Sequence, residues 1–335
     1  MEENQKKTLF SGIQPTGRLT IGNYLGALSN WVKLQDEYNC IFCIVDQHSI
    51  TVNQVPAELR QKTMNLLALY LAAGVDPDKN VIFIQSHVPA HAELTWVLLC
   101  NTYIGELNRM TQFKQKSQQH AANINAGLMD YPVLMASDIL LYQTDLVPVG
   151  QDQKQHLELS RDLAERFNNK YSPTFVVPEP YIAKVGSKIM SLQNPTVKMS
   201  KSDENEKATI FLDDDKDTII RKFKAAVTDS DNRIVFSADK PAISNLLTIY
   251  SAFSGVSIKD AEKEFDGVGY GDFKLRVADA VIAKLEPIQK RQQELLKDKD
   301  YLNSILIKGA QTANYLANKT LSKVYRKVGF VQLDK

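Results

Sequence analysis

The first half of the chain alternates short apolar runs with longer stretches in which apolar positions recur at helical spacing. The apolar runs, which are typical of buried strands, cover residues 8–13, 40–45, 81–85 and 146–148. The stretches with helical spacing cover residues 24–37, 56–73 and 91–101. This alternation predicts an α/β fold in which a parallel sheet carries helices on both faces, a Rossmann-type nucleotide-binding architecture.

The pattern changes after about residue 192. A polar segment at 194–206 is followed by an acidic patch at 213–217, and most of the remaining chain has helical spacing. We therefore predict a Rossmann-type domain followed by a smaller all-helical domain, with a mobile loop and linker between them. The expected boundaries are 1–193 for the first domain, 194–206 for the loop, 207–295 for the helical domain, and 296–335 for final helices that pack back on the first domain.

Two short motifs suggest a site that grips a nucleotide from two sides. Thr20-Ile21-Gly22-Asn23 follows the first apolar run and a Pro-Thr-Gly turn, and it opens a helix predicted at 23–38. A strand, a tight turn and a helix N-terminus form an anion site, because unpaired N–H groups and the helix dipole face the turn. Lys198-Met199-Ser200-Lys201-Ser202 places two lysines, which suit phosphate oxygens, in a segment that is predicted to be a loop. Either motif alone is weak, since the first fits a packing point and the second a charged linker.

Bulk composition adds few constraints. The 335 residues are 44% hydrophobic and 24% charged, and the formal net charge is +1. A net charge this small creates no overall electrostatic field that would indicate a nucleic-acid partner, although a local basic patch that binds RNA is compatible with a nearly neutral chain. The polar N-terminus and the lack of a long apolar stretch predict a cytoplasmic protein with no signal peptide or membrane span.

Three sets of residues have spacings that resemble metal or redox motifs. Cys40 and Cys43 form a C-x-x-C within a predicted strand, where residues three apart point to opposite faces, so we expect two buried thiols. His87 and His91 have zinc-like spacing, but Pro89 would break the helix that both would need. The Asp213–Asp215 run lacks the spaced ligands of a calcium loop. We therefore predict no metal site built by the protein.

With both nucleotide motifs in place, the chain resembles the class I aminoacyl-tRNA synthetases. Lys198–Ser202 matches the KMSKS loop of that class letter for letter, and Thr20–Asn23 occupies the position of its His-Ile-Gly-His element, here Thr-Ile-Gly-Asn. Within the class, the chain resembles the bacterial tryptophanyl-tRNA synthetases over essentially its whole length. The runs that carry this resemblance are 12–17, 22–27, 136–142, 150–156 and 226–230.

Asp138 bears on the choice of amino acid. It lies in an apolar segment, 133–142, where a carboxylate is costly unless it is hydrogen-bonded. An indole N–H is only a donor, so an aspartate is a matching acceptor, and such a bond contributes about 1.5–3 kcal/mol. In an anonymous chain a helix-capping or salt-bridged aspartate would be the better interpretation. The resemblance favours a role in binding the indole.

The resemblance implies further site residues by position. Around tryptophan, Phe10, Gly12, His48, Met135, Val147 and Val149 would wall the indole, and Tyr131 and Gln153 would hold the amino group. Around ATP it implies Gln14, Pro15, Thr16, Gly22, Asn23, Gly150, Gln151, Asp152, Ile189, Lys198, Met199, Ser200, Lys201 and Ser202. Thr20, Asn23, Lys198 and Lys201 would be catalytic, and His48 is expected to transfer no proton. Lys114 could contact the γ-phosphate or be a solvated helix charge.

The reaction that the resemblance implies is tryptophan–tRNA ligation. Tryptophan would be activated by ATP, with Mg²⁺ bound through the phosphates, and passed to tRNA(Trp), whose anticodon the helical domain would read. A homodimer is implied, with neither DNA nor a membrane as partner. Three alternatives stay open at this point: a tyrosyl-tRNA synthetase, a small-molecule nucleotidyltransferase, and a non-catalytic tryptophan sensor.

Overall fold

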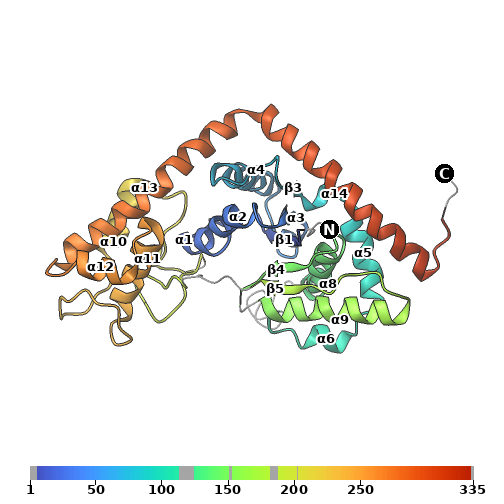
Figure 1. Ribbon diagram of the computed structural model, residues 1–335, viewed down its shortest axis with the longest axis horizontal. Helices are drawn as coiled ribbons and strands as arrows, with labels where there is room; N and C mark the ends of the chain where they lie inside the picture. Colours follow the sequence, from blue (N-terminus) through green and yellow to red (C-terminus); the bar gives the residue numbers. More distant parts are fainter. Residues whose placement is uncertain (1–5, 113–123, 151–152, 182–187, 202, 333–335) are drawn as a thin grey trace, which may run out of the picture.

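The computed structural model describes residues 6–112, 124–150, 153–181, 188–201 and 203–332. Its centre is a parallel sheet of five strands in the order β3-β2-β1-β4-β5 (Figure 1). The strands are β1 (Thr8–Ile13), β2 (Asn39–Ile44), β3 (Val81–Ile84), β4 (Leu146–Pro148) and β5 (Glu179–Tyr181). The predicted fold class is confirmed. Strand β5 was not predicted, because it is three residues long and contains Pro180.

Helices cover both faces of the sheet, and the alternation of side chains along the strands explains why. Cys40, Phe42 and Ile44 of β2 enter one hydrophobic core, and Ile41 and Cys43 enter the other. The first core includes α2 (Ser29–Leu34) and α4 (Pro56–Ala72). The second includes α5 (Ala90–Leu99), α8 (Ala126–Leu140) and α9 (Lys154–Lys170). Short helices α3 (Asp46–Ser49), η2 (Gln85–His87) and α6 (Ile104–Asn108) connect these elements.

The first helical stretch differs from the one predicted at 23–38. It begins as α1 (Ile21–Asn23), widens into a π-helical turn, η1 (Tyr24–Leu28), and ends with α2 at Leu34. Single π-turns inside helices commonly occur near functional sites. Apolar spacing did not reveal the wider turn, because Tyr24 and Leu28 are buried in either geometry.

The second half of the chain is helical apart from loops. It comprises η4 (Glu206–Ala208), α10 (Lys216–Lys224), α11 (Pro241–Ser254), α12 (Ile258–Glu264), α13 (Tyr270–Lys297) and α14 (Lys299–Val328). Helix α13 packs against α10 and α11 and also against α4 beside the sheet, and α14 continues from it over β3 and α5. Together the two long helices arch across the molecule (Figure 1). The first hydrophobic core runs without a break from the sheet into α10, α11 and α13. The predicted boundary near 207 therefore separates two architectures that share a core.

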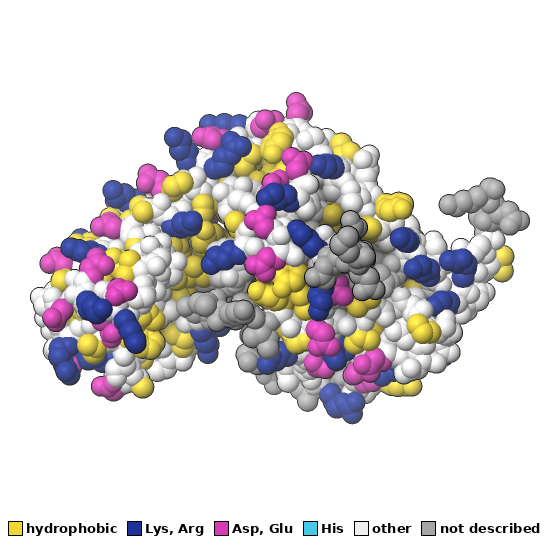
Figure 2. Space-filling view, in the orientation of Figure 1, with side chains coloured by type: hydrophobic (Ala, Val, Ile, Leu, Met, Phe, Trp, Pro, Cys, Tyr) yellow, Lys and Arg dark blue, Asp and Glu magenta, His cyan; other side chains and the backbone are white. Residues whose placement is uncertain are grey.

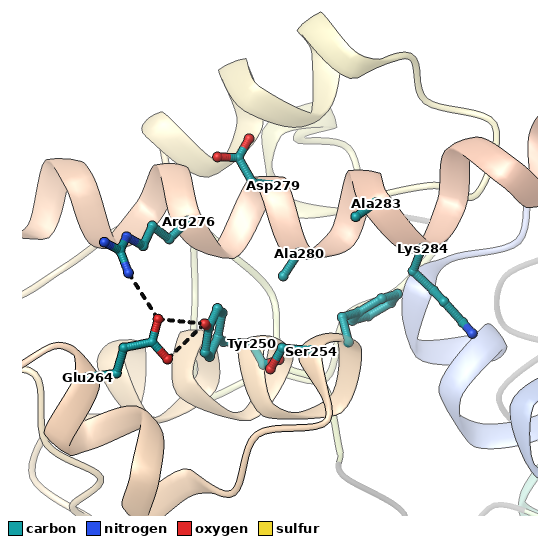
Figure 3. Close-up of a pocket in the computed structure, with 9 residues that line it drawn as sticks. Tyr250, Ser254, Glu264, Arg276, Asp279, Ala280, Ala283 and Lys284 are labelled. Atoms are coloured by element: carbon teal, nitrogen blue, oxygen red, sulfur yellow. Dashed lines mark hydrogen bonds and ion pairs between the residues drawn. The ribbon is translucent and has the colours of Figure 1, made fainter.

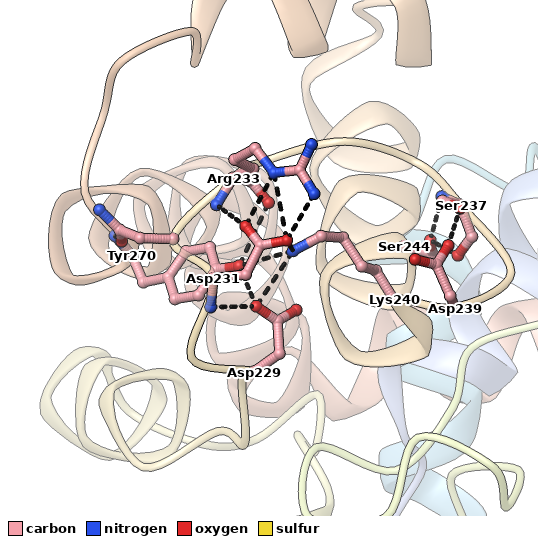
Figure 4. A network of polar contacts seen from close by, with 9 residues as sticks. Asp229, Asp231, Arg233, Ser237, Asp239, Lys240, Ser244 and Tyr270 are labelled. Carbon is pink, nitrogen blue, oxygen red and sulfur yellow. Dashed lines mark hydrogen bonds and ion pairs between the residues drawn. The ribbon is translucent and has the colours of Figure 1, made fainter.

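A polar network ties the loop before α11 to the start of α13 (Figure 4). The buried ammonium of Lys240 lies 3.0 Å from carboxylate oxygens of both Asp229 and Asp231. The hydroxyl of Tyr270 donates to Asp229 at 2.5 Å. Hydrogen bonds from Arg233 and Lys240 hold the pKa of Asp231 well below its ordinary value. The network supplies partners that a buried lysine needs.

The surface carries charges of both signs. Figure 2 shows Lys and Arg interspersed with Asp and Glu over the visible face, in keeping with the net charge of +1. Among the described residues, no helix is long and apolar enough to cross a membrane. Cys40 and Cys43 are buried in different cores, whereas Cys100 is exposed.

Candidate active site

The strand order reverses between β1 and β4, and a cavity of about 350 Å³ opens at the carboxyl ends of these strands. Ligands of open α/β sheets bind at such a point. The cavity is lined by the end of β1 and by β4 with the residues that follow, and α3 and α8 contribute the polar side chains of His48, Tyr131 and Asp138. All nine positions predicted around tryptophan line this cavity: Phe10, Gly12, His48, Tyr131, Met135, Asp138, Val147, Val149 and Gln153.

Three of the predicted nucleotide residues reach the same cavity, namely Gln14, Asn23 and Lys201. One concave site therefore joins an apolar part near Phe10 and Val147 to a polar part near the β1 turn. Such a shape suits a ligand with an aromatic ring at one end and charged groups at the other.

Asp138 is the most constrained side chain in the cavity. It is 1% exposed and accepts hydrogen bonds at Oδ1 from Gln85 Nε2 (2.6 Å) and His91 Nδ1 (2.6 Å), and at Oδ2 from His48 Nε2 (2.8 Å). Burial alone would raise the pKa of its carboxyl, but the charge and hydrogen bonds of His48 and His91 outweigh burial and lower that pKa. Asp138 is thus a buried, ionised acceptor.

Two of the three donors to Asp138 were missed by the sequence analysis. Gln85 follows β3 directly, and its side-chain oxygen also accepts from the backbone N–H of Gln47 at 3.1 Å. His91 was considered only as a metal ligand with His87, yet His91 is fully buried while His87 is exposed. The signal that could have found them is a polar residue at the end of a buried strand and a histidine on the apolar face of a helix.

A second histidine organises the part of the cavity next to β4. The ring of His156, which is 1% exposed, bonds Tyr131 Oη through Nε2 (3.1 Å) and Gln153 Oε1 through Nδ1 (2.9 Å). Tyr131 and Gln153 are the two residues predicted to hold an amino group. His156, which does not line the cavity, therefore holds the orientation of the two side chains that do.

Thr20 and Asn23 engage each other in a capping box. Asn23 Oδ1 accepts from the backbone N–H of Thr20 at 3.0 Å, and Thr20 Oγ1 accepts from the backbone N–H of Asn23 at 3.2 Å. Thr20 is buried, and its place is secured by the bond from Ile21 N to Ile210 O at 3.0 Å. Thr20 therefore shapes the turn, whereas Asn23 also lines the cavity.

The lysine-rich segment lies against the β1 turn. Lys201 Nζ donates to the carbonyl oxygen of Thr16 at 2.9 Å, and desolvation lowers the pKa of Lys201. Gly17, whose φ is +67°, adopts the left-handed conformation that favours glycine, and a Cβ there would lie 3.3 Å from Lys201 Cδ. Met199 is buried and its N–H bonds Ile189 O at 3.0 Å. At Met199, the predicted mobile loop is anchored to the core.

The remaining predicted nucleotide residues lie around the cavity without lining it. Gly22 faces Ile189, Thr16 contacts Lys201, and Pro15 lines a neighbouring hollow with Arg18 and Leu66. Ser200 accepts from Thr209 Oγ1 at 2.8 Å, Lys198 is bridged to Met190, and Gly150 accepts from the N–H of Gln153. Gln151, Asp152, Ser202 and Lys114 lie outside the described residues.

Comparison with known proteins agrees with this fold. Residues 2–286 match the family model described as tRNA synthetases class I (W and Y). The chain is 61% identical to a tryptophan–tRNA ligase of Clostridium tetani, with 100% of this chain and 98% of the relative covered. The crystal structure of tryptophanyl-tRNA synthetase from Mycoplasma pneumoniae superposes with a TM-score of 0.89 at 36% identity, covering 98% of this chain and 99% of that one.

A further solved structure carries bound ligands. Tryptophanyl-tRNA synthetase from Campylobacter jejuni, complexed with ADP and tryptophan, superposes with a TM-score of 0.83 at 33% identity, covering 96% of this chain and 100% of that one. The chain belongs to the class I tRNA synthetases for tryptophan and tyrosine. Within them it belongs with the tryptophan–tRNA ligases. Tryptophan–tRNA ligase activity follows from this membership, and the tyrosyl and non-synthetase alternatives are set aside.

Proposed function

We propose that the cavity binds tryptophan with its indole N–H on Asp138 Oδ2 and activates it with ATP. The observation that carries this proposal is a buried carboxylate, ionised and at the end of an apolar cavity. A site built around such an acceptor rejects ligands that lack the matching donor by roughly 10⁴–10⁵. Phe10, Met135 and Val147 would contact the ring, and Tyr131 and Gln153 the amino group.

The first step needs no protein nucleophile or general base. The tryptophan carboxylate, already ionised at neutral pH, attacks the α-phosphorus of ATP. The bond from that phosphorus to the bridging oxygen breaks, and its electrons leave with pyrophosphate. The protein's contribution is to align the two reactants and to stabilise the charge on the leaving group. In the second step the 2′-hydroxyl of the terminal adenosine of tRNA(Trp) attacks the carbonyl carbon of the adenylate. The bond from that carbon to the phosphate oxygen breaks and its electrons leave with AMP, the hydroxyl proton passes to the phosphate or to water, and the tryptophanyl group is now esterified to the tRNA.

The leaving pyrophosphate would be met by Lys198 and Lys201. In the structure Lys201 lines the cavity together with Gln14 and Asn23, and it donates to the carbonyl oxygen of Thr16 in the turn after β1, which supports a contact with phosphates bound there. We propose that ATP replaces the Thr16 carbonyl as its partner. Among the described residues, no group of three or more His, Cys, Asp or Glu side chains could hold a metal. Mg²⁺ would therefore be held by phosphate oxygens and water, and it would supply charge neutralisation.

An ATP–pyrophosphate exchange assay across the aromatic amino acids tests the substrate assignment. Asp138→Ala should weaken selection of tryptophan over tyrosine while ATP binding survives. Asp130→Ala, on the same helix but outside the cavity, is the matched control. An unchanged preference for tryptophan in Asp138→Ala would remove Asp138 from this role.

A second variant tests the phosphate assignment. Lys201→Ala should slow adenylate formation strongly and leave tryptophan affinity nearly intact, because the lysine bonds the turn after β1 at Thr16 and takes no part in the hydrogen bonds that hold Asp138. Lys207→Ala, an exposed lysine a few residues on, controls for loss of charge. Equal losses in exchange rate and tryptophan binding would contradict the assignment.

We also propose that the helical region contacts tRNA. A cavity of about 590 Å³ lies between α11, α12 and α13 (Figure 3), and Arg276 and Lys284 carry positive charge at its rim. Glu264 is held in it by Tyr250 Oη at 3.0 Å and Arg276 at 2.9 Å. Unstacked bases bind where cations and aromatic rings occur together. Lys284→Ala should raise KM for tRNA without changing pyrophosphate exchange, and a change in exchange alone would oppose this role.

Finally, we propose that the protein is a cytoplasmic homodimer. Trp96 on α5 and Tyr103 and Ile104 at the start of α6 are large apolar side chains that are 65–70% exposed, and exposed apolar surface of this kind supports an interface with a second copy. Trp96→Glu combined with Ile104→Glu should give a monomer by sedimentation at micromolar concentration. Ile307→Glu, an exposed apolar position on α14, is the control. A monomeric wild-type protein would refute the proposal.

A further inference from the structure

His91 lies behind the substrate cavity rather than in it. It is 0% exposed and is not among the residues that line the cavity. Both ring nitrogens are engaged, Nδ1 with Asp138 Oδ1 at 2.6 Å and Nε2 with Tyr142 Oη at 2.8 Å. The ring also packs 5.8 Å from Phe83 and 5.6 Å from Tyr142, between centroids. His91 therefore reaches the substrate only through Asp138.

The direction of the bond between His91 and Asp138 follows from chemistry. An ionised carboxylate only accepts, so His91 Nδ1 carries a proton and donates to Asp138. The other ring nitrogen, Nε2, is bonded to the Tyr142 hydroxyl at 2.8 Å. Burial raises the pKa of Tyr142 well above its ordinary value, so the hydroxyl keeps its proton. The bond to Tyr142 thus helps to hold the ring with Nδ1 directed at Asp138.

The donors are unequally divided between the two carboxylate oxygens. Within the described part of the chain, Oδ1 accepts from both Gln85 and His91, whereas Oδ2 accepts from His48 alone. A carboxylate offers about four acceptor sites, and the open one is on Oδ2. His48, which shares Oδ2, lines the cavity with Asp138. The two donors on Oδ1 hold the carboxylate so that its remaining acceptor site is on the oxygen next to the substrate.

We propose that His91 is a positioning residue for tryptophan selection, acting by holding Asp138 ionised and turned so that Oδ2 accepts the indole N–H. This inference rests on the tryptophan activation proposed above. Without the His91 donor, the buried carboxylate would lose part of its stabilisation and could take up a proton or rotate. Either change would remove the acceptor that distinguishes an indole from a ring of the same shape without an N–H.

The test compares tryptophan with its benzothiophene analogue, in which sulfur replaces the N–H. In pyrophosphate exchange, His91→Leu should lower kcat/KM for tryptophan about tenfold or more, mainly through KM, and leave KM for ATP unchanged. The ratio of kcat/KM for tryptophan over the analogue should fall by a similar factor. His91→Asn, whose amide N–H can take the place of Nδ1–H, should restore most of the ratio.

Two further variants keep the test decisive if His91→Leu folds poorly. Tyr142→Phe keeps the ring and removes only the hydroxyl, and it should lower the same ratio by a smaller factor. In an Asp138→Asn background, adding His91→Leu should change the ratio by less than about twofold, because one residue acts through the other. Thermal unfolding midpoints identify losses that are purely of stability.

An unchanged ratio in folded His91→Leu and Tyr142→Phe would overturn the proposal and leave His91 a core residue. Additive losses in the double variant would overturn it as well. Failure of the wild-type protein to exchange pyrophosphate with tryptophan would instead refute the proposed function, so the two failures are distinguishable.

Discussion

Among the described glycines, Gly309 on α14 is the one where an added Cβ would come closest to a neighbouring backbone, and Gly309→Ala is a direct test of how α14 holds the sheet edge. A Cβ at this position would lie 1.8 Å from the carbonyl oxygen of Ile82 and 2.8 Å from its carbon. Both atoms belong to the backbone of β3, so no side-chain rotation can relieve the clash. Since ordinary C···O contacts are about 3.3 Å, α14 would have to move by roughly 1.5 Å.

The expected free-energy change has two parts of opposite sign. Overpacking of a well-packed contact costs typically about 1–3 kcal/mol, and alanine gains about 0.5–1 kcal/mol over glycine within a helix. Because the contact is backbone against backbone, we expect the upper part of the first range and a net loss of about 2 kcal/mol in the free energy of unfolding. Gly271→Ala in α13 is the control, since no atom lies within 4 Å of its added Cβ.

Urea unfolding followed by circular dichroism measures both variants against the wild-type protein. Gly309→Ala should have a lower midpoint, and Gly271→Ala a midpoint equal to or above that of the wild type. Equal or same-direction shifts in the two variants would refute the close approach of α14 to β3.

Two further predictions concern ionisation. Lys240→Met should destabilise the protein most near neutral pH. The lowered pKa of Asp231 contributes stability that is present above the ordinary pKa of 3.8 and is lost as the pH falls below that value. The difference in thermal unfolding midpoint between variant and wild type should therefore shrink below about pH 4, and a pH-independent difference would oppose the ion pair. Burial raises the pKa of Cys40 to about 12 and that of Cys43 well above its ordinary value. In the native protein only Cys100 should therefore react with a thiol reagent that is used at low concentration. Rapid labelling of all three thiols would contradict the burial of Cys40 and Cys43.

The sequence predicted the sheet well, because buried strands depend on local pattern. Apolar runs marked four of the five strands to within a residue or two, and the strand–turn–helix at Thr20 marked the ligand end of β1. The resemblance supplied the nine tryptophan positions, and the fold brings them together. Their roles stay predictions until variants are assayed.

What the sequence could not reveal are contacts between distant segments. Gln85 and His91 meet Asp138 across 53 and 47 positions, and neither has a local motif. The segment around Lys198 was predicted to be mobile from its polar composition, and its mobility stays a prediction; the sequence did not reveal that Met199 packs into the core and pairs with Ile189. A polar composition indicates that a segment can be exposed to solvent. Whether one of its side chains is held in the core depends on a partner elsewhere in the chain, which the local pattern does not contain.

The capping box formed by Thr20 and Asn23 has a consequence for the pH dependence of the enzyme. Where the class has two imidazoles, this chain has a hydroxyl and a carboxamide that satisfy each other. Neither group gains or loses a proton between pH 5 and 8, unlike histidine. The entrance to the first helix therefore keeps the same charge and shape throughout the physiological range, and any dependence of adenylate formation on acidity within it must originate in other groups.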